Sequence, residues 1–213
     1  SLIQKVQRQQ ENQQTKIGEI ENRISKNEQD YKDIKNKKDE IKQNINIIKQ
    51  FKENEEFNGI INYIRTLHKN DIYNEINMTS SSIYNGREPN NVLNLDEDED
   101  FASDDKPNQW LCFDFKNHFI IPNYYTIKCR CGHYYSRGWI LEGSNDNSNW
   151  TKIDERSNIS FPEDEKSFLS FKIENPTNQK FRFFRITATQ PYNSNSDYFL
   201  IIESFEFFGI YTC

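Results

Sequence analysis

Residues 139–150 read WILEGSNDNSNW and are followed by TKID at residues 151–154. A run of seven Gly, Ser, Asn and Asp residues separates two apolar ends. These residue types favour tight turns, because Gly tolerates positive φ and because Asn and Asp side chains bond to the nearby backbone. The stretch therefore predicts a β-hairpin with strands at Gly138–Gly143 and Thr151–Ile153.

Further short segments around this hairpin also have strand character, since they are rich in aromatic and β-branched residues and are bounded by Gly, Asn, Asp and Pro. They are Gln109–Phe115, Tyr124–Cys131, Phe168–Ile173, Phe181–Thr189 and Phe199–Phe208. Many short strands without helical periodicity indicate an all-β head, an antiparallel β-sandwich or jelly roll. We place this head at residues 57–213, with a short docked helix predicted at Phe57–Ile64.

Residues 1–53 carry a different pattern, with no Pro and only Gly18 among the glycines. Apolar residues recur at alternating spacings of three and four, which is the a and d pattern of a coiled coil. The narrow apolar seam predicts an N-terminal α-helical coiled-coil stalk that associates with other helices. The residues expected to form the seam are Ile17, Ile20, Ile24, Tyr31, Ile34, Ile41, Ile45 and Ile48.

The charges beside the seam favour a parallel arrangement, in which position g of one chain meets position e of the next heptad of its partner. The pairs of opposite charge are Lys16–Glu21, Arg23–Glu28 and Asp30–Lys35. A fourth pair, Lys37–Lys42, would repel. Ile at both a and d favours a homotrimer, with a dimer as the alternative. Polar or bulky seam residues are expected to set the register, namely Gln10, Gln13, Asn27, Tyr31 and Lys38.

The charge of the chain is uneven, because residues 1–56 carry a net +1 within a total of −6. The acidic head argues against nucleic acid and anionic membrane as partners, since both require clustered positive charge.

No apolar run approaches the roughly 18 residues that span a bilayer. With three His outside any recognisable motif and no phosphate-binding glycine loop, we expect no enzymatic activity and no cofactor.

The four cysteines are Cys112, Cys129, Cys131 and Cys213. Cys112 and Cys129 look like strand residues, and Cys129 and Cys131 are too close within one strand to pair comfortably with each other. We therefore expect reduced thiols and an intracellular, cytoplasmic location.

Four segments in order resemble the discoidin family, the coagulation factor V/VIII type C or galactose-binding-like domains. They are residues 108–115 (NQWLCFDF), 139–150 (WILEGSNDNSNW), 181–186 (FRFFRI) and 201–209 (IIESFEFFG). The resemblance covers Phe57–Tyr211 and is closest to the intracellular versions found in protists. It implies a non-catalytic binding domain in which Trp110, Trp139 and Trp150 pack between the sheets.

The resemblance also implies that four loops meet at a ligand end: Ser80–Asn91, Asp96–Asn108, Arg130–Arg137 and Gln190–Asp197. Aromatic rings can stack on the C–H face of a sugar, and Arg and His can bond to its hydroxyls. The candidate ligand-binding residues in these loops are Tyr84, Arg87, His133, Tyr134, Arg137 and Tyr192. The acidic run at residues 96–100 is interpreted as a solvated loop.

Some relatives hold a structural calcium ion beside a closing glutamate, a role open to Glu203 or Glu206. The other oxygen donors cannot be assigned from sequence, so we predict no metal site.

Our main interpretation is a coiled coil that multiplies a discoidin-like head, which recognises a protein partner through its loops. The alternatives are a lectin that uses the same loops for a glycan and a structural assembly protein in which the head is only a cap.

Overall fold

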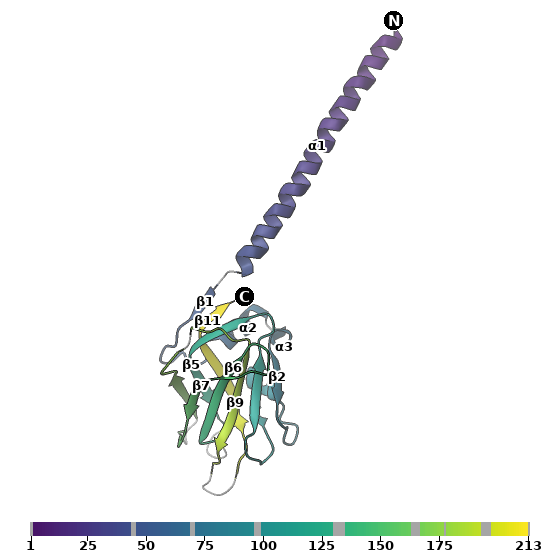
Figure 1. Ribbon diagram of the computed structural model, residues 1–213. Coiled ribbons are helices and arrows are strands. Elements are labelled where there is room, and N and C mark those ends of the chain that lie inside the picture. The colour runs from purple at the N-terminus through teal and green to yellow at the C-terminus, as the bar shows by residue number, and fades with distance from the viewer. Residues whose placement is uncertain are drawn as a thin grey trace. The chain divides into compact units, whose positions relative to one another are not determined.

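The computed structural model describes residues 2–43, 46–68, 71–95, 99–129, 135–162, 167–176, 178–192 and 197–212. It divides into two compact units, Ser1–Ile45 and Asn46–Cys213 (Figure 1). The first unit is helical, whereas the second is an antiparallel β-sandwich with short helices. The predicted fold class, an all-β head preceded by a long helix, is confirmed.

Helix α1 spans Leu2–Gln43. Its Gln, Glu and Lys residues have high helix propensity and lose little rotamer freedom in a helix. Residues 2–37 are exposed, apart from Gly18, which is half-buried. None of the helices in the described ranges combines the length and the apolar character that crossing a membrane requires.

The predicted stalk boundary at residue 53 is wrong, because the helix ends at Gln43 and Asn46–Lys49 form strand β1. Strand β1 pairs with the last strand of the head, so Ile48 belongs to a sheet and is not a seam residue of the helix. Isoleucine is common in β-strands as well as in coiled-coil seams, so Ile47 and Ile48 are compatible with either structure. The hydrogen bonds between β1 and β11 favour the strand. Ile45 lies outside the described residues, and the side chain of Ile41 is not described.

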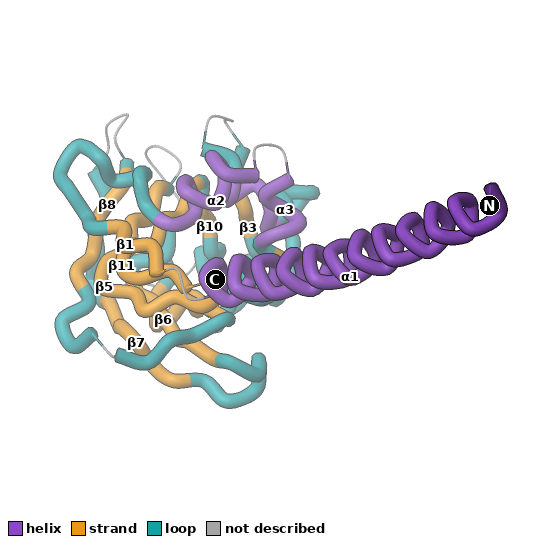
Figure 2. Tube along the Cα trace, turned by 90° about the horizontal axis from the view of Figure 1, so that it is seen from above, coloured by secondary structure: helices purple, strands orange, loops and turns teal. Residues whose placement is uncertain are grey.

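The head consists of two main antiparallel sheets and a small two-stranded one, with the strand orders β1-β11-β5-β8, β2-β4-β9-β6-β7 and β10-β3. The strands are β1 (Asn46–Lys49), β2 (Asn77–Ser80), β3 (Phe101–Ala102), β4 (Trp110–Asp114), β5 (Phe119–Lys128), β6 (Gly138–Ser144), β7 (Thr151–Arg156), β8 (Phe168–Lys172), β9 (Phe183–Gln190), β10 (Ile201–Ile202) and β11 (Ser204–Thr212). The helices of the head are α2 (Ile60–His68), α3 (Ile72–Glu75) and the 3₁₀ helix η2 (Pro89–Leu93). Figure 2 shows the strands β1, β11, β5 and β8 grouped together, with α2 and α3 beside one another.

Each strand predicted from the sequence corresponds to an observed strand, and β1, β2 and β3 are additional. The predicted last strand is displaced: Phe199 and Leu200 precede β10, and β11 continues past Gly209 to Thr212. Gly209 sits at a bulge with φ 140°, where a Cβ atom would lie 2.0 Å from the carbonyl oxygen of Ile121. Glycine therefore permits β11 to bend and continue.

The hairpin turn that follows β6 is organised by Asp146. Its Oδ1 accepts hydrogen bonds from the backbone N–H of Ser148 at 2.9 Å and of Asn149 at 2.7 Å. These bonds favour the ionised carboxylate and hold the pKa of Asp146 below its ordinary value. The predicted polar turn is therefore an Asp-centred turn, as its composition indicates.

The core between the two main sheets is aromatic, and it includes Phe113, Phe115, Phe184, Phe205 and Phe207. Neighbouring rings lie 4.7 to 6.5 Å apart, within the range of favourable aromatic pairs.

Of the three tryptophans, only Trp139 is fully buried and part of this core. Trp110 alternates along β4 with the buried Leu111 and thus faces outward, and Trp150 lies under the guanidinium of Arg185, 4.1 Å from the ring centre. The expectation that Trp110 and Trp150 pack between the sheets is wrong. Trp110 falls on the outer face of β4, because side chains alternate faces along a strand, and Trp150 lies just before β7, against Arg185.

Candidate functional site

The strand register places several loops at one end of the sandwich. Ser80 at the end of β2 pairs with Leu111 near the start of β4, and Gly138 at the start of β6 pairs with Gln190 at the end of β9. In Figure 1 this is the end toward which β9 runs, away from the C-terminus. The loops containing the candidate ligand-binding residues therefore gather at one end, together with the loop between β7 and β8, which the sequence analysis did not include.

Tyr84 and Arg87 lie in a tight turn that is attached to β3. The N–H of Tyr84 donates to the carbonyl of Ala102 at 2.8 Å, and the N–H of Arg87 donates to the carbonyl of Tyr84 at 3.0 Å. Asn85 and Gly86, between them, have φ angles of 49° and 71°, which Asn and Gly tolerate best. The sequence therefore forms this turn locally, and the small sheet fixes its position.

The guanidinium of Arg87 is held by Asp100. Nε donates to one carboxylate oxygen of Asp100, and a terminal nitrogen donates to the other. Asp100 is 5% exposed, whereas Arg87 is 26% exposed. The ion pair uses two of the five N–H donors of the guanidinium, and the remaining donors are oriented by its fixed plane. The interpretation of residues 96–100 as a solvated loop is therefore wrong for Asp100, while residues 96–98 lie outside the described residues.

A hollow of about 300 Å³ opens beside this ion pair and is lined by Tyr84, Arg87, Phe199 and Ile201. The rings of Tyr84 and Phe199 meet edge to face, with centres 5.2 Å apart. Tyr84 is 39% exposed, so part of its ring remains available to a ligand. The hollow combines aromatic surface with a guanidinium of fixed orientation, the two features that a small polar ligand with an apolar face requires.

Tyr192 belongs to a second aromatic group at the same end. Its ring lies 5.1 Å from that of Tyr135, which also packs against Phe161 at 4.9 Å. These rings pack on their own domain, and their burial stabilises the loops. The structure thus brings Tyr84 and Arg87 together and places Tyr192 in a different group.

The remaining candidates lie in the loop before β6. His133 and Tyr134 are outside the described residues. Arg137 is half-buried, and its carbonyl accepts a hydrogen bond from the N–H of Ile159 at 2.8 Å. Phe199 and Asp100 could not be recognised from the sequence as parts of this site. Which residues line the hollow, and which carboxylate pairs with Arg87, depends on which loops meet in the folded head.

The two glutamates considered for calcium both have protein partners. Glu203 accepts a hydrogen bond from Lys128. Buried Glu206 accepts hydrogen bonds from the N–H groups of Ile61 at 2.7 Å, Asn62 at 3.0 Å and Phe207 at 2.9 Å. Burial raises the pKa of Glu206 to about 7, although these N–H groups favour the carboxylate.

The carboxylate of Glu206 thus caps the first turn of helix α2, whose free N–H groups carry partial positive charge. A cation at the same carboxylate would face these dipoles, so Glu206 does not fit the role of a calcium ligand. Across the described ranges, no three His, Cys, Asp or Glu side chains form a group that could hold a metal ion.

The two described histidines lie away from the loop end and share one carboxylate. His68 Nδ1 is 3.4 Å from Glu75 Oε1, and His118 Nε2 is 3.5 Å from Glu75 Oε2. His118 follows β4, at the end of the sandwich opposite to Tyr84. These contacts connect α2, α3 and the turn after β4, which is a structural role.

Comparison with solved structures shows the same fold in carbohydrate-binding modules. CBM32-3 from a family 31 glycoside hydrolase of Clostridium perfringens is 17% identical and covers 64% of this chain and 92% of its own, with a TM-score of 0.52. CpGH89CBM32-5 of Clostridium perfringens, solved in complex with GalNAc-β-1,3-galactose, is 19% identical and covers 64% and 96%, with a TM-score of 0.50.

No curated protein sequence matches the chain. The sequence model of the F5/8 type C domain family, in contrast, matches residues 75–204, which is more than half of the chain. This range contains three of the four segments that carry the resemblance and the start of the fourth. The chain therefore belongs to the F5/8 type C domain family.

Proposed function

We propose that the head binds a neutral carbohydrate in the hollow formed by Tyr84, Arg87, Phe199 and Ile201. The observation that carries the proposal is the pairing of two aromatic rings with a guanidinium fixed by Asp100 around an open hollow. A sugar ring presents an apolar C–H face to the aromatic wall and hydroxyl acceptors to the N–H donors.

The charge of the hollow favours a neutral ligand over an anionic one. The positive charge of Arg87 is offset by the carboxylate of Asp100, so the guanidinium contributes directed donors without a net positive field. The chain as a whole is acidic, with a net charge of −6, and would repel anionic ligands. A neutral hexose or N-acetylhexosamine unit satisfies both conditions.

The comparisons support this proposal over the protein partner that we preferred from the sequence. The two structural neighbours described above are carbohydrate-binding modules, and one of them was solved with GalNAc-β-1,3-galactose. This disaccharide is accordingly the first probe for the present chain. We keep the absence of catalysis as part of the proposal, because the matched region is a binding domain of the F5/8 type C family.

The test is a glycan array probed with the labelled full chain, followed by titration of the best glycan and of GalNAc-β-1,3-galactose. Tyr84→Ala removes the exposed aromatic wall and should weaken binding by about tenfold or more, or about 1.4 kcal/mol. Arg87→Lys keeps a positive charge beside Asp100 but loses the planar fork, and it should also weaken binding.

Ile83→Ala is the matched control, because Ile83 is the neighbour of Tyr84 and is similarly exposed at 43% but lines a different hollow with Pro89 and Asn90. This variant should bind as the wild type does. All variants are compared by thermal unfolding so that a loss of fold is recognised. The proposal is refuted if no glycan is retained, or if Tyr84→Ala and Ile83→Ala bind equally well.

A further inference from the structure

Helix α1 presents an apolar stripe without a partner among the described residues. Ile17 is 51% exposed, Ile20 55%, Ile24 51% and Ile34 66%. Such residues repeat at the a and d positions of successive heptads, so they form one line along the helix. Burying these apolar side chains against another helix lowers the free energy. A second helix with the same heptad repeat presents side chains that pack between them.

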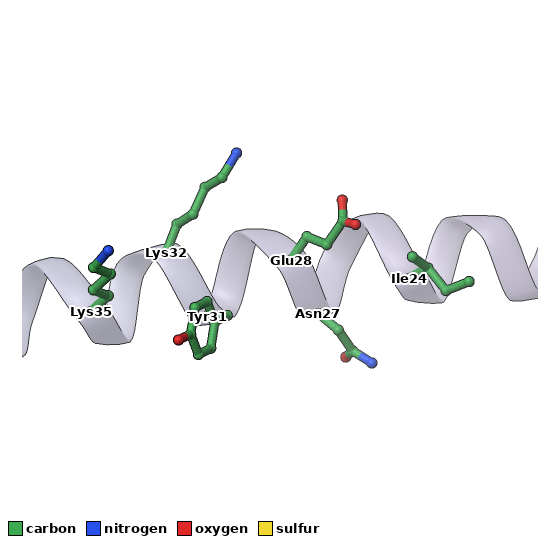
Figure 3. Close-up of a pocket in the computed structure, with 6 residues that line it drawn as sticks. All are labelled: Ile24, Asn27, Glu28, Tyr31, Lys32 and Lys35. Atoms are coloured by element: carbon green, nitrogen blue, oxygen red, sulfur yellow. The ribbon is translucent and has the colours of Figure 1, made fainter.

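A shallow hollow in this stripe has the composition of a coiled-coil packing site. Four of its residues are Ile24, Asn27, Glu28 and Tyr31, which occupy positions a, d, e and a. In Figure 3 Asn27 projects from the helix on the side opposite to Glu28. A coiled-coil side chain packs into a hole made by four residues of the facing helix, and in a parallel pair this set of four surrounds a d residue of the partner.

The charges flanking the hollow indicate how the partner lies. Arg23 at position g would meet Glu28 at position e of the partner, and Asp30 would meet Lys35. Charge complementarity therefore favours a second copy of this chain in parallel orientation.

We propose that further copies of this chain dock on α1 in parallel and in register, and that Asn27 with Tyr31 forms the layer that sets the register. In this arrangement the amide of Asn27 enters the hollow of its partner and meets the partner's equivalent amide. A shift by one heptad would place that amide against Ile20 or Ile34 and leave it without a hydrogen-bond partner. Ile at both a and d favours three copies.

The first experiment measures mass and alignment on the full chain. Light scattering at micromolar concentration should give three times the 25.5 kDa of one chain. Under mild oxidation Ile24→Cys should form cross-linked pairs of chains, because equivalent a positions meet only in a parallel, in-register assembly. Asn22→Cys, on the outward f position, and the wild type, with its native cysteines, are the controls. The mass of a single chain, or equal cross-linking of Asn22→Cys, overturns the proposal.

The second experiment isolates the role of Asn27. Chains carrying Ile17→Cys are mixed with chains carrying Ile24→Cys, two positions that meet only after a shift of one heptad. With Asn27 present, the mixed pair should not cross-link. After Asn27→Ile the same pair should cross-link, while the thermal unfolding temperature of the helix rises because an apolar layer replaces a polar one. Equal cross-linking with and without the Asn27→Ile substitution would contradict the register role. Neither readout depends on glycan binding by the head.

Discussion

At the scale of single residues, the head is organised by buried polar groups that connect distant strands. Trp139 Nε1 donates to the hydroxyl of Tyr125 at 3.0 Å, and this hydroxyl donates to Asp154 at 2.6 Å. Asp154 also accepts from Arg156 at 2.7 Å. The chain of bonds links β5 in one sheet to β6 and β7 in the other, so the Tyr125 hydroxyl bridges the two layers.

Replacing Tyr125 with Phe should lower the free energy of unfolding by about 1–3 kcal/mol, because the buried N–H of Trp139 loses its acceptor. Burial raises the pKa of Tyr125 above its ordinary value of 10, so the wild-type hydroxyl stays a donor at neutral pH. Urea unfolding measures the change. Tyr124→Phe, at the neighbouring half-buried position, is the control, and an equal effect of both substitutions would contradict the bridging role.

Glu206 should make stability depend on pH. Burial raises its pKa in the folded state to about 7 from an ordinary value of 4.5, so the folded state binds a proton that the unfolded state has lost between these values. The free energy of unfolding is therefore greatest below about pH 4.5, as far as this group is concerned, and falls as pH rises toward 7. Glu206→Gln cannot titrate. The difference between the two stability curves should show this fall, and parallel curves would refute it.

At the scale of elements, strand β1 ties the chain entering the head to its last strand. Asn46–Lys49 pair with residues 209–212 of β11, and Phe51 just beyond stacks on Tyr124 with ring centres 4.7 Å apart. Phe51 also meets Phe208 edge to face at 5.4 Å. The head therefore begins at residue 46, ahead of the start at residue 57 predicted from the sequence.

A head that begins at residue 57 should be less stable than one that begins at residue 46, by roughly 2–4 kcal/mol, because it loses the β1 pairing and the packing of the half-buried ring of Phe51. Chemical unfolding followed by Trp fluorescence measures both chains. The chain starting at Asn46 should have the same unfolding midpoint as the head of the full protein. Identical midpoints for the two shortened chains would show that β1 contributes nothing.

At the scale of the whole molecule, the proposed glycan site and the proposed assembly of α1 would act together. Several linked heads bind a glycan-coated surface more tightly than one head does, because the second binding event is intramolecular. Ile20→Asn combined with Ile24→Asn should lower apparent affinity for such a surface by about a hundredfold, while affinity for the soluble disaccharide stays unchanged. Asn22→Gln, on the outward face, should change neither. Equal surface binding by all three chains would refute multivalency.

The sequence predicted the features that depend on local chemistry. The turn after β6 follows from Asp146 and its neighbours, and the long helix follows from composition and heptad spacing. The intracellular location, the oligomeric state and the ligand remain predictions. The errors lie where a helix and a strand fit the local pattern equally well, as at Ile48, and where the side of the sheet that a ring packs on depends on distant strands, as at Trp110 and Trp150.

By itself, the sequence determined the strands of the hairpin and the helical character of residues 2–43, because periodicity and turn chemistry act over a few neighbouring residues. The resemblance of four segments indicated the fold family. Only the tertiary structure decided that Asp100 orients Arg87, that Phe199 packs against Tyr84 and that Glu206 caps helix α2. These contacts join residues 13 to 145 positions apart, and their partners are selected by strand register and burial, which no local pattern records.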